Sequence, residues 1–144
     1  MTPRADVVAC ARTWIETPYQ HQARLKGVGV DCAGLIIGVA RELGIVTADF
    51  DVQGYARQPD GSSLLQWCEQ SMFRIERPAM QPGDVVVVAF DAAPGHMGIV
   101  GDYLHGGLSI IHALGITAKR VIETRLMISP AMRFVRAYRM PGVE

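Results

Sequence analysis

The chain has 144 residues, of which 49% are hydrophobic and 19% are charged, so we expect one globular domain over residues 1–144 and exclude a disordered chain. Fourteen basic residues balance fourteen acidic ones, which leaves no electrostatic reason to expect a nucleic acid partner. The three cysteines are an odd number, and an odd number argues against a disulfide framework.

The first half of the chain is predicted to be helical. Apolar residues at helical spacing indicate a helix over residues 3–16, which ends where Thr17 precedes Pro18. This segment lacks the continuous apolar stretch of a signal peptide, so we expect synthesis in the cytoplasm without one, and we expect no membrane insertion. A second helix from Asp31 to Leu43 is apolar nearly all round, which places it at the centre of the fold.

The second half of the chain is predicted to form strands, after a short helix from Leu64 to Cys68. A turn at Gly106 and Gly107 joins two of these strands. We therefore expect an α+β domain in which the helices pack on an antiparallel sheet of about five strands. The expected strands are Val85–Phe90, Met97–Tyr103, Leu108–Leu114, Lys119–Leu126 and Phe134–Met140.

Cys32 is the candidate nucleophile. It follows Asp31, the expected cap, and so lies at the N-terminus of the apolar helix. The unpaired N–H groups and the partial positive charge at this end of a helix favour a thiolate, which is the reactive form of cysteine. The same N–H groups could hold an oxyanion during acyl transfer. Cys10 and Cys68 have no such surroundings and are expected to be small buried side chains.

Two histidines complete a candidate catalytic set. His96 is expected at the start of a strand, and His112 lies in the middle of the next, otherwise apolar strand. The turn between the strands makes them antiparallel, and a register that pairs His112 with Gly98 or Val100 places both rings on one face of the sheet. His112 would then orient the His96 ring while His96 activates Cys32.

Other chemistry has weaker support in the sequence. Zinc bound by Cys32, His96 and His112 is an alternative, but no Cys or His pair has the close spacing of a zinc site, and we expect no metal or cofactor. His21 lies in the loop before Cys32 and has no assigned role. His105 is expected to be a solvated residue at the turn between two strands.

The motifs around these residues resemble the NlpC family of cell-wall cysteine peptidases, and in particular its phage branch, the cell-wall peptidases of prophages and gene transfer agents. The resemblance covers residues 14–140 and rests on Thr17–Pro18–Tyr19, Asp31–Cys32–Ala33–Gly34–Leu35, Gly95–His96–Met97–Gly98–Ile99–Val100 and Ile111–His112–Ala113. The similarity to the phage branch rests on Tyr19–Gln20–His21–Gln22–Ala23, Lys26–Gly27 and Phe134–Val135.

The resemblance implies a papain-like α+β fold and hydrolysis of amide bonds in peptidoglycan stem peptides, commonly next to D-glutamate and diaminopimelate. Cys32 matches the nucleophile, His96 the base and His112 the orienting third residue of the family. Tyr19 matches a tyrosine near the oxyanion and substrate pocket, and Asp31 matches an aspartate that binds a substrate amine in some members. The family implies no cofactor.

One departure from the family pattern concerns recognition of the substrate. Ala33 replaces a serine that follows the cysteine in many members, which removes a hydroxyl that could contact a free stem-peptide N-terminus. The expected partners are the peptidoglycan peptide and, for a member of the phage branch, phage tail proteins. Such a chain would reach the cell wall in a virion or through holin-type release. The alternatives are an amidase on the same fold and a non-catalytic or weakly catalytic tail assembly subunit.

Overall fold

The computed structural model describes residues 1–52, 63–91 and 93–144. Its helices are α1 (Arg4–Arg12), α2 (Cys32–Glu42), α3 (Ser63–Ser71) and the 3-10 turn η1 (Arg77–Ala79). Its strands are β1 (Arg24–Leu25), β2 (Gly29–Val30), β3 (Phe73–Ile75), β4 (Val85–Phe90), β5 (Ala93–Asp102), β6 (Leu108–Leu114), β7 (Arg120–Arg125) and β8 (Arg133–Arg139). None of the helices in these ranges has the length and hydrophobicity that crossing a membrane requires.

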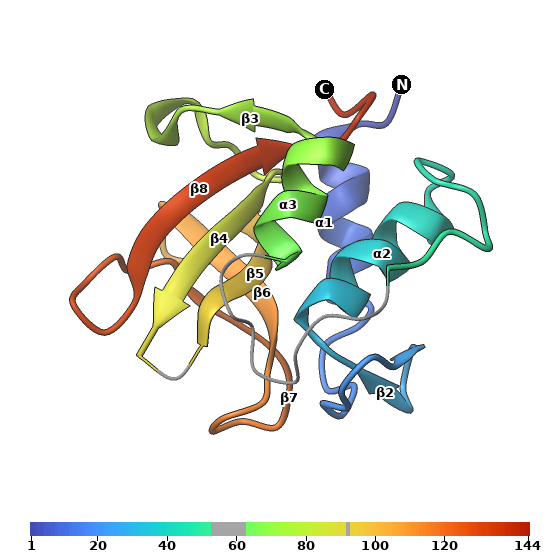
Figure 1. Ribbon diagram of the computed structural model, residues 1–144. Helices are drawn as coiled ribbons and strands as arrows, with labels where there is room; N and C mark the ends of the chain where they lie inside the picture. The colour runs from blue at the N-terminus through green and yellow to red at the C-terminus, as the bar shows by residue number, and fades with distance from the viewer. Residues whose placement is uncertain (53–62, 92) are drawn as a thin grey trace.

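The strands form two antiparallel sheets. β1 and β2 make a small hairpin, and the other strands form one sheet of six in the order β3-β8-β4-β5-β6-β7. Figure 1 shows α1, α2 and α3 together on one side of the large sheet. The predicted α+β architecture, with helices packed on an antiparallel sheet, is confirmed.

The predicted strands are all present, but β5 begins at Ala93 and not at Met97, so His96 lies within the strand and not at its start. The sheet also gains a short sixth strand at one edge. This strand, β3, pairs with the end of β8, from Phe73 opposite Arg139 to Ile75 opposite Ala137. A strand of three residues is too short for alternation to predict it, and two of its three residues, Phe73 and Arg74, are exposed.

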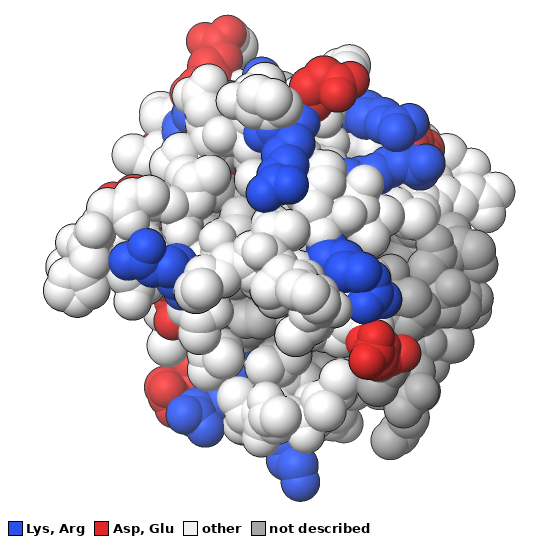
Figure 2. Space-filling view, turned by 90° about the vertical axis from the view of Figure 1, so that its left-hand side faces the viewer, with Lys and Arg blue, Asp and Glu red and all other residues white. Residues whose placement is uncertain are grey.

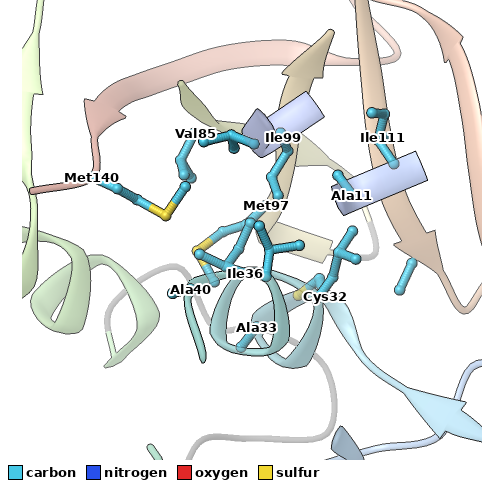
Figure 3. Packing of buried hydrophobic residues seen from close by; sticks show 14 of the residues in the cluster. Ala11, Cys32, Ala33, Ile36, Ala40, Val85, Met97, Ile99, Ile111 and Met140 are labelled. Carbon is cyan, nitrogen blue, oxygen red and sulfur yellow. The ribbon is translucent and has the colours of Figure 1, made fainter. Parts of the chain in front are cut away.

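α2 lies at the centre of the fold, as its apolar sequence predicts. The Asp31 carboxylate accepts a hydrogen bond from the Gly34 N–H at 2.8 Å and caps the helix. Residues 32–40 are all buried, and the helix packs against β5 and β6. Figure 3 shows this packing, with Ile36 of α2 beside Met97 of β5.

The first helix is shorter than predicted. α1 ends at Arg12, and residues 13–16 form turns. Glu16 has a φ of 77°, which lies outside the helical region. Its N–H donates to Val121 O at 3.0 Å, so contact with the large sheet replaces the last predicted turn of the helix.

Residues 45–61 lie between α2 and α3. Residues 45–52 form neither helix nor strand, and the rest of that segment lies outside the described residues. α3 begins at Ser63 and runs to Ser71, so the predicted short helix through Cys68 is present.

The large sheet is apolar on both faces. Met97 and Ile99 of β5 belong to the core beneath α2, whereas Val88 of β4 and Val100 of β5 belong to a second cluster on the opposite face. His96 pairs with Val88, and paired residues of an antiparallel sheet point to the same side. The His96 side chain is therefore directed to the face of the second cluster.

Charged side chains are dispersed on the face drawn in Figure 2. Within its described part, basic and acidic groups are interspersed, several of them side by side, with uncharged surface between these small clusters. Some surface charges form ion pairs, such as Arg133 with Asp91 at 3.1 Å. The described part of this face therefore shows no extended block of one sign that would attract a polyanion.

Candidate active site

Cys32 is the first residue of α2, as predicted, and only 3% of its surface is exposed. Burial and the adjacent Asp31 carboxylate raise the pKa of its thiol to about 12. The backbone N–H groups of Met97, Ala33 and Cys32 itself lower the pKa of the thiol, but their effect is smaller than that of burial. The resting thiol is therefore protonated at neutral pH, and the thiolate predicted from the helix N-terminus is not the resting form.

A gap in the large sheet lies next to this sulfur. The pairing of β5 with β6 ends at Ile99 and Ile111, while β6 stays paired with β7 as far as Leu114. Residues 96–98 of β5 and residues 112–114 of β6 therefore border a gap, which we call the β5–β6 opening.

Cys32 contacts β5 at the β5–β6 opening. The N–H groups of an antiparallel strand point alternately to its two neighbours. The Val100 N–H donates to Asp84 O on the β4 side at 2.8 Å, so alternation directs the Met97 N–H to the β6 side. Where β6 has separated, this N–H faces the Cys32 sulfur instead and acts to lower the pKa of its thiol. The sulfur thus meets the peptide unit that joins His96 to Met97.

His96 and His112 are in direct contact at the same opening. The Nε2 atom of His96 lies 2.8 Å from Nδ1 of His112, and the rings meet edge to face at 64°. The strand register brings His112 opposite Gly98, so the prediction that both rings share one face is confirmed. A Cβ on Gly98 would lie 2.5 Å from the Ile110 side chain, which fills the space that the glycine leaves.

Both histidine rings are neutral at neutral pH. Burial, together with the neighbouring His112 ring, holds the pKa of His96 well below its usual value of 6.5. Burial lowers the pKa of His112 to about 4. His112 Nε2 is buried and has no hydrogen-bond partner within the part of the chain that the structure describes. A neutral imidazole keeps one bare nitrogen and is the form that can accept a proton.

The described residues show no hydrogen bond between the Cys32 sulfur and the His96 ring. The structure brings the two histidines together and places Cys32 against the adjoining Met97 peptide, while the pairing of thiol and imidazole remains a prediction. Within residues 1–52, 63–91 and 93–144, no group of His, Cys, Asp and Glu side chains is arranged to hold a metal ion.

Tyr19 and Asp31 both lie near the nucleophile. Tyr19 forms a bridge with Val30, and its ring covers Gly115, where a Cβ would lie 2.9 Å from a ring carbon. Gly115 directly follows β6, so Tyr19 packs at the end of the strand that carries His112. Asp31, which is 1% exposed, directly precedes α2. Contact of either side chain with a substrate stays a prediction.

The remaining histidines lie outside the β5–β6 opening. His21 Nδ1 lies 3.8 Å from Asp31 Oδ2, and His105 is exposed at the turn after β5, as predicted. Sequence reasoning assigned no role to Arg24, although its Nη1 atom lies 3.0 Å from Asp31 Oδ1. Only the fold of the β1–β2 hairpin brings this arginine to the helix N-terminus, so no local sequence signal predicts the contact.

The family model described as "NlpC/P60 family" matches residues 16–136, which is most of the chain. The chain belongs to the NlpC/P60 family. The matched range includes Cys32, His96 and His112. A comparison with curated proteins gives no match.

Solved structures share the fold of this NlpC/P60 chain. The NlpC/p60 domain of the peptidoglycan hydrolase SagA is 26% identical, with a TM-score of 0.60 over 95% of this chain and 98% of that one. An N-acetylmuramoyl-L-alanine amidase from Bacteroides uniformis is 12% identical, with a TM-score of 0.64 over 95% of this chain and 98% of that one. NlpC2 from Trichomonas vaginalis is 19% identical, with a TM-score of 0.66 over 95% of this chain but only 46% of that one. These likenesses confirm the predicted papain-like NlpC fold.

Proposed function

We propose that this NlpC/P60 chain is a cysteine endopeptidase that hydrolyses amide bonds in peptidoglycan stem peptides. The proposal is carried by the arrangement at the β5–β6 opening, where Cys32 faces β5, the strand that bears His96, and where His96 is hydrogen-bonded to His112 of β6. Cysteine acyl transfer requires a nucleophile, a base and an orienting group on adjacent elements. The substrate class is supported by the SagA domain, which is part of a peptidoglycan hydrolase and is similar over nearly the whole chain.

His96 is the general base in the proposed reaction. Its ring is neutral because burial and His112 hold its pKa low, so it can take the thiol proton as the Cys32 sulfur attacks the scissile carbonyl carbon. The hydrogen bond of 2.8 Å from Nε2 to His112 orients the ring and leaves Nδ1 for that proton. The proton then passes to the leaving amine, and water hydrolyses the thioester and restores the thiol.

The first turn of α2 supplies donors for the oxyanion. The N–H groups of Cys32 and Ala33 have no intrahelical acceptor at this end of the helix, and both are directed at the sulfur. They are therefore placed to stabilise the tetrahedral oxyanion that forms next to it. Because Ala33 has no hydroxyl, we propose that the chain does not depend on a serine contact to a free stem-peptide N-terminus.

The first test is digestion of purified diaminopimelate-type peptidoglycan, with the released fragments read by mass spectrometry. Cys32→Ala has no nucleophile and is expected to lower fragment release by about a thousandfold or more. Cys10→Ala is the matched control, because that thiol lies 3.5 Å from Glu42 at the far end of α2, and it is expected to digest like wild type. Equal release by wild type and Cys32→Ala would show that Cys32 is not the nucleophile.

The same fragments identify the bond that is cut. On the family resemblance, we propose a bond next to D-glutamate and diaminopimelate. Cleavage between sugar and peptide would instead favour an amidase, which is the activity named for the Bacteroides uniformis structure. Association with a phage tail is also a proposal from the resemblance, and copurification with tail proteins tests it. Copurification without any hydrolysis would favour the non-catalytic tail subunit.

A further inference from the structure

Arg24 is a buried arginine next to the nucleophile, and the mechanism above does not use it. Its side chain is 9% exposed. Its Nε donates to Asp51 Oδ1 at 2.9 Å, its Nη1 to Asp31 Oδ1 at 3.0 Å and its Nη2 to Val52 O at 2.9 Å. An arginine is rarely buried unless its charge is paired, and here the guanidinium lies between two carboxylates.

Asp31 connects Arg24 to the first turn of α2. Its Oδ1 also accepts from the Gly34 N–H at 2.8 Å, and its Oδ2 accepts from the Gln22 N–H at 2.7 Å. The contact is close, because a Cβ on Gly34 would lie 2.8 Å from Arg24 Nη1. The guanidinium therefore packs directly on the helical turn that begins with Cys32.

We propose that Arg24 is a positioning residue, which holds Asp31 on the first turn of α2 and neutralises the carboxylate charge beside the Cys32 sulfur. The proposal rests on the proposed role of Cys32 as the nucleophile. A carboxylate next to a thiol opposes its ionisation, and a guanidinium bound to that carboxylate offsets part of this effect. Solvent screens charges little in a buried site, so the balance between the Arg24 and Asp31 charges has a large effect on how readily the Cys32 thiol ionises.

Two other titratable side chains near the sulfur, His96 and Cys68, do not carry charge at neutral pH. Burial and His112 hold the pKa of His96 low, and burial raises the pKa of Cys68 in α3 to about 12, with Cys32 adding to the effect. His21 lies on the far side of the Asp31 carboxylate, with 3.8 Å between Nδ1 and Oδ2. Within the described part of the chain, His21, His96 and Cys68 are thus the titratable side chains other than Arg24 that are placed near Cys32 or Asp31.

The test compares the rate at which iodoacetamide alkylates Cys32 in wild type, Arg24→Gln, Asp31→Asn and the double variant. Mass spectrometry of the peptide that contains Cys32 follows this thiol alone. Arg24→Gln leaves the Asp31 charge uncompensated and is expected to slow alkylation about tenfold at about pH 8, which corresponds to about one pKa unit. Asp31→Asn keeps a capping side chain and should accelerate alkylation. The double variant should return to within about threefold of the wild-type rate.

If Arg24 had a purely structural role, Arg24→Gln would change the alkylation rate of Cys32 in the opposite direction. Loosening the first turn would expose the thiol, so Arg24→Gln would react faster and Asp31→Asn would not compensate. Faster or unchanged alkylation of Arg24→Gln therefore overturns the proposal. Arg139→Gln is the matched control, because it also removes a guanidinium bound to a buried carboxylate, that of Asp84. It is expected to leave the alkylation rate of Cys32 unchanged.

A second variant covers the case in which Arg24→Gln does not fold. Arg24→Lys keeps the charge but loses the forked contacts, and its Cys32 should react within about threefold of the wild-type rate. A tenfold lower alkylation rate in Arg24→Lys would overturn the proposal, because it would show that a positive charge at this position does not maintain the reactivity of Cys32. No step of this experiment uses peptidoglycan, so a failure to digest cell walls would refute the proposed function without changing these rates.

Discussion

At the Cys32 sulfur, two opposing influences act on one proton. The N–H groups of the helix N-terminus and of Met97 favour the thiolate, whereas burial and Asp31 favour the thiol and prevail. A buried neutral thiol needs a base that is also neutral, and the burial of His96 meets that need. The Cys32 thiol and the His96 imidazole therefore form no ion pair at rest, and in the proposed reaction their charges arise only as the substrate is attacked.

The burial of His112 makes stability in acid a direct test of the histidine pair. Burial lowers its pKa from 6.5 to about 4, so between these values the unfolded chain binds a proton that the folded chain does not. The contribution of His112 to the free energy of unfolding should be fully present above about pH 6.5. As the pH falls toward 4, the free energy of unfolding should decrease by about 3 kcal/mol because of this group. Urea unfolding of His112→Asn should show a smaller fall over this range than wild type. The exposed His105→Asn should keep the wild-type slope, and an unchanged slope in His112→Asn would contradict the assigned burial.

Gly38 of α2 lies directly against Trp14, which is in the turn that follows α1. A Cβ at this position would lie 2.4 Å from the Trp14 ring, which is closer than side chains pack. Gly38→Ala is therefore expected to lower the free energy of unfolding by about 1–3 kcal/mol, although alanine favours a helix over glycine by about 1 kcal/mol. In the double variant with Trp14→Phe, the smaller ring should relieve part of this cost. Urea unfolding measures both changes, and a Gly38→Ala variant as stable as wild type would show that the Trp14 ring can move away freely.

The elements that the sequence predicts are those whose own residues determine them. The cap Asp31 and an apolar run suffice for α2, and the turn between β5 and β6 suffices to bring His96 and His112 together. What the sequence cannot predict depends on packing between distant segments. The end of the β5–β6 pairing at Ile99, the burial that keeps the thiol protonated, and the seating of Arg24 on α2 all arise only when the helices close on the sheet.

Asp84 joins the N-terminal helix to the sheet over most of the length of the chain. Its carboxylate is fully buried and lies 2.9 Å from Arg4 Nη1 and 3.0 Å from Arg139 Nε. Arg4 is the first residue of α1 and Arg139 is the last residue of β8, while Asp84 directly precedes β4. One buried charge therefore holds segments from both ends of the chain against the strand next to the β5–β6 opening.

Removing this charge should destabilise the fold more than removing a charge at the surface. Asp84→Asn leaves two partly buried guanidinium groups without their counter-charge and is expected to lower the free energy of unfolding by about 3 kcal/mol. Asp91→Asn is the matched control, because Asp91 pairs with Arg133 at 3.1 Å but its side chain is 96% exposed. That variant should lose less than about 1 kcal/mol, since water screens an exposed pair. Urea unfolding of both variants in one buffer makes the comparison, and equal losses would mean that the Asp84 cluster stabilises the chain no more than a surface ion pair does.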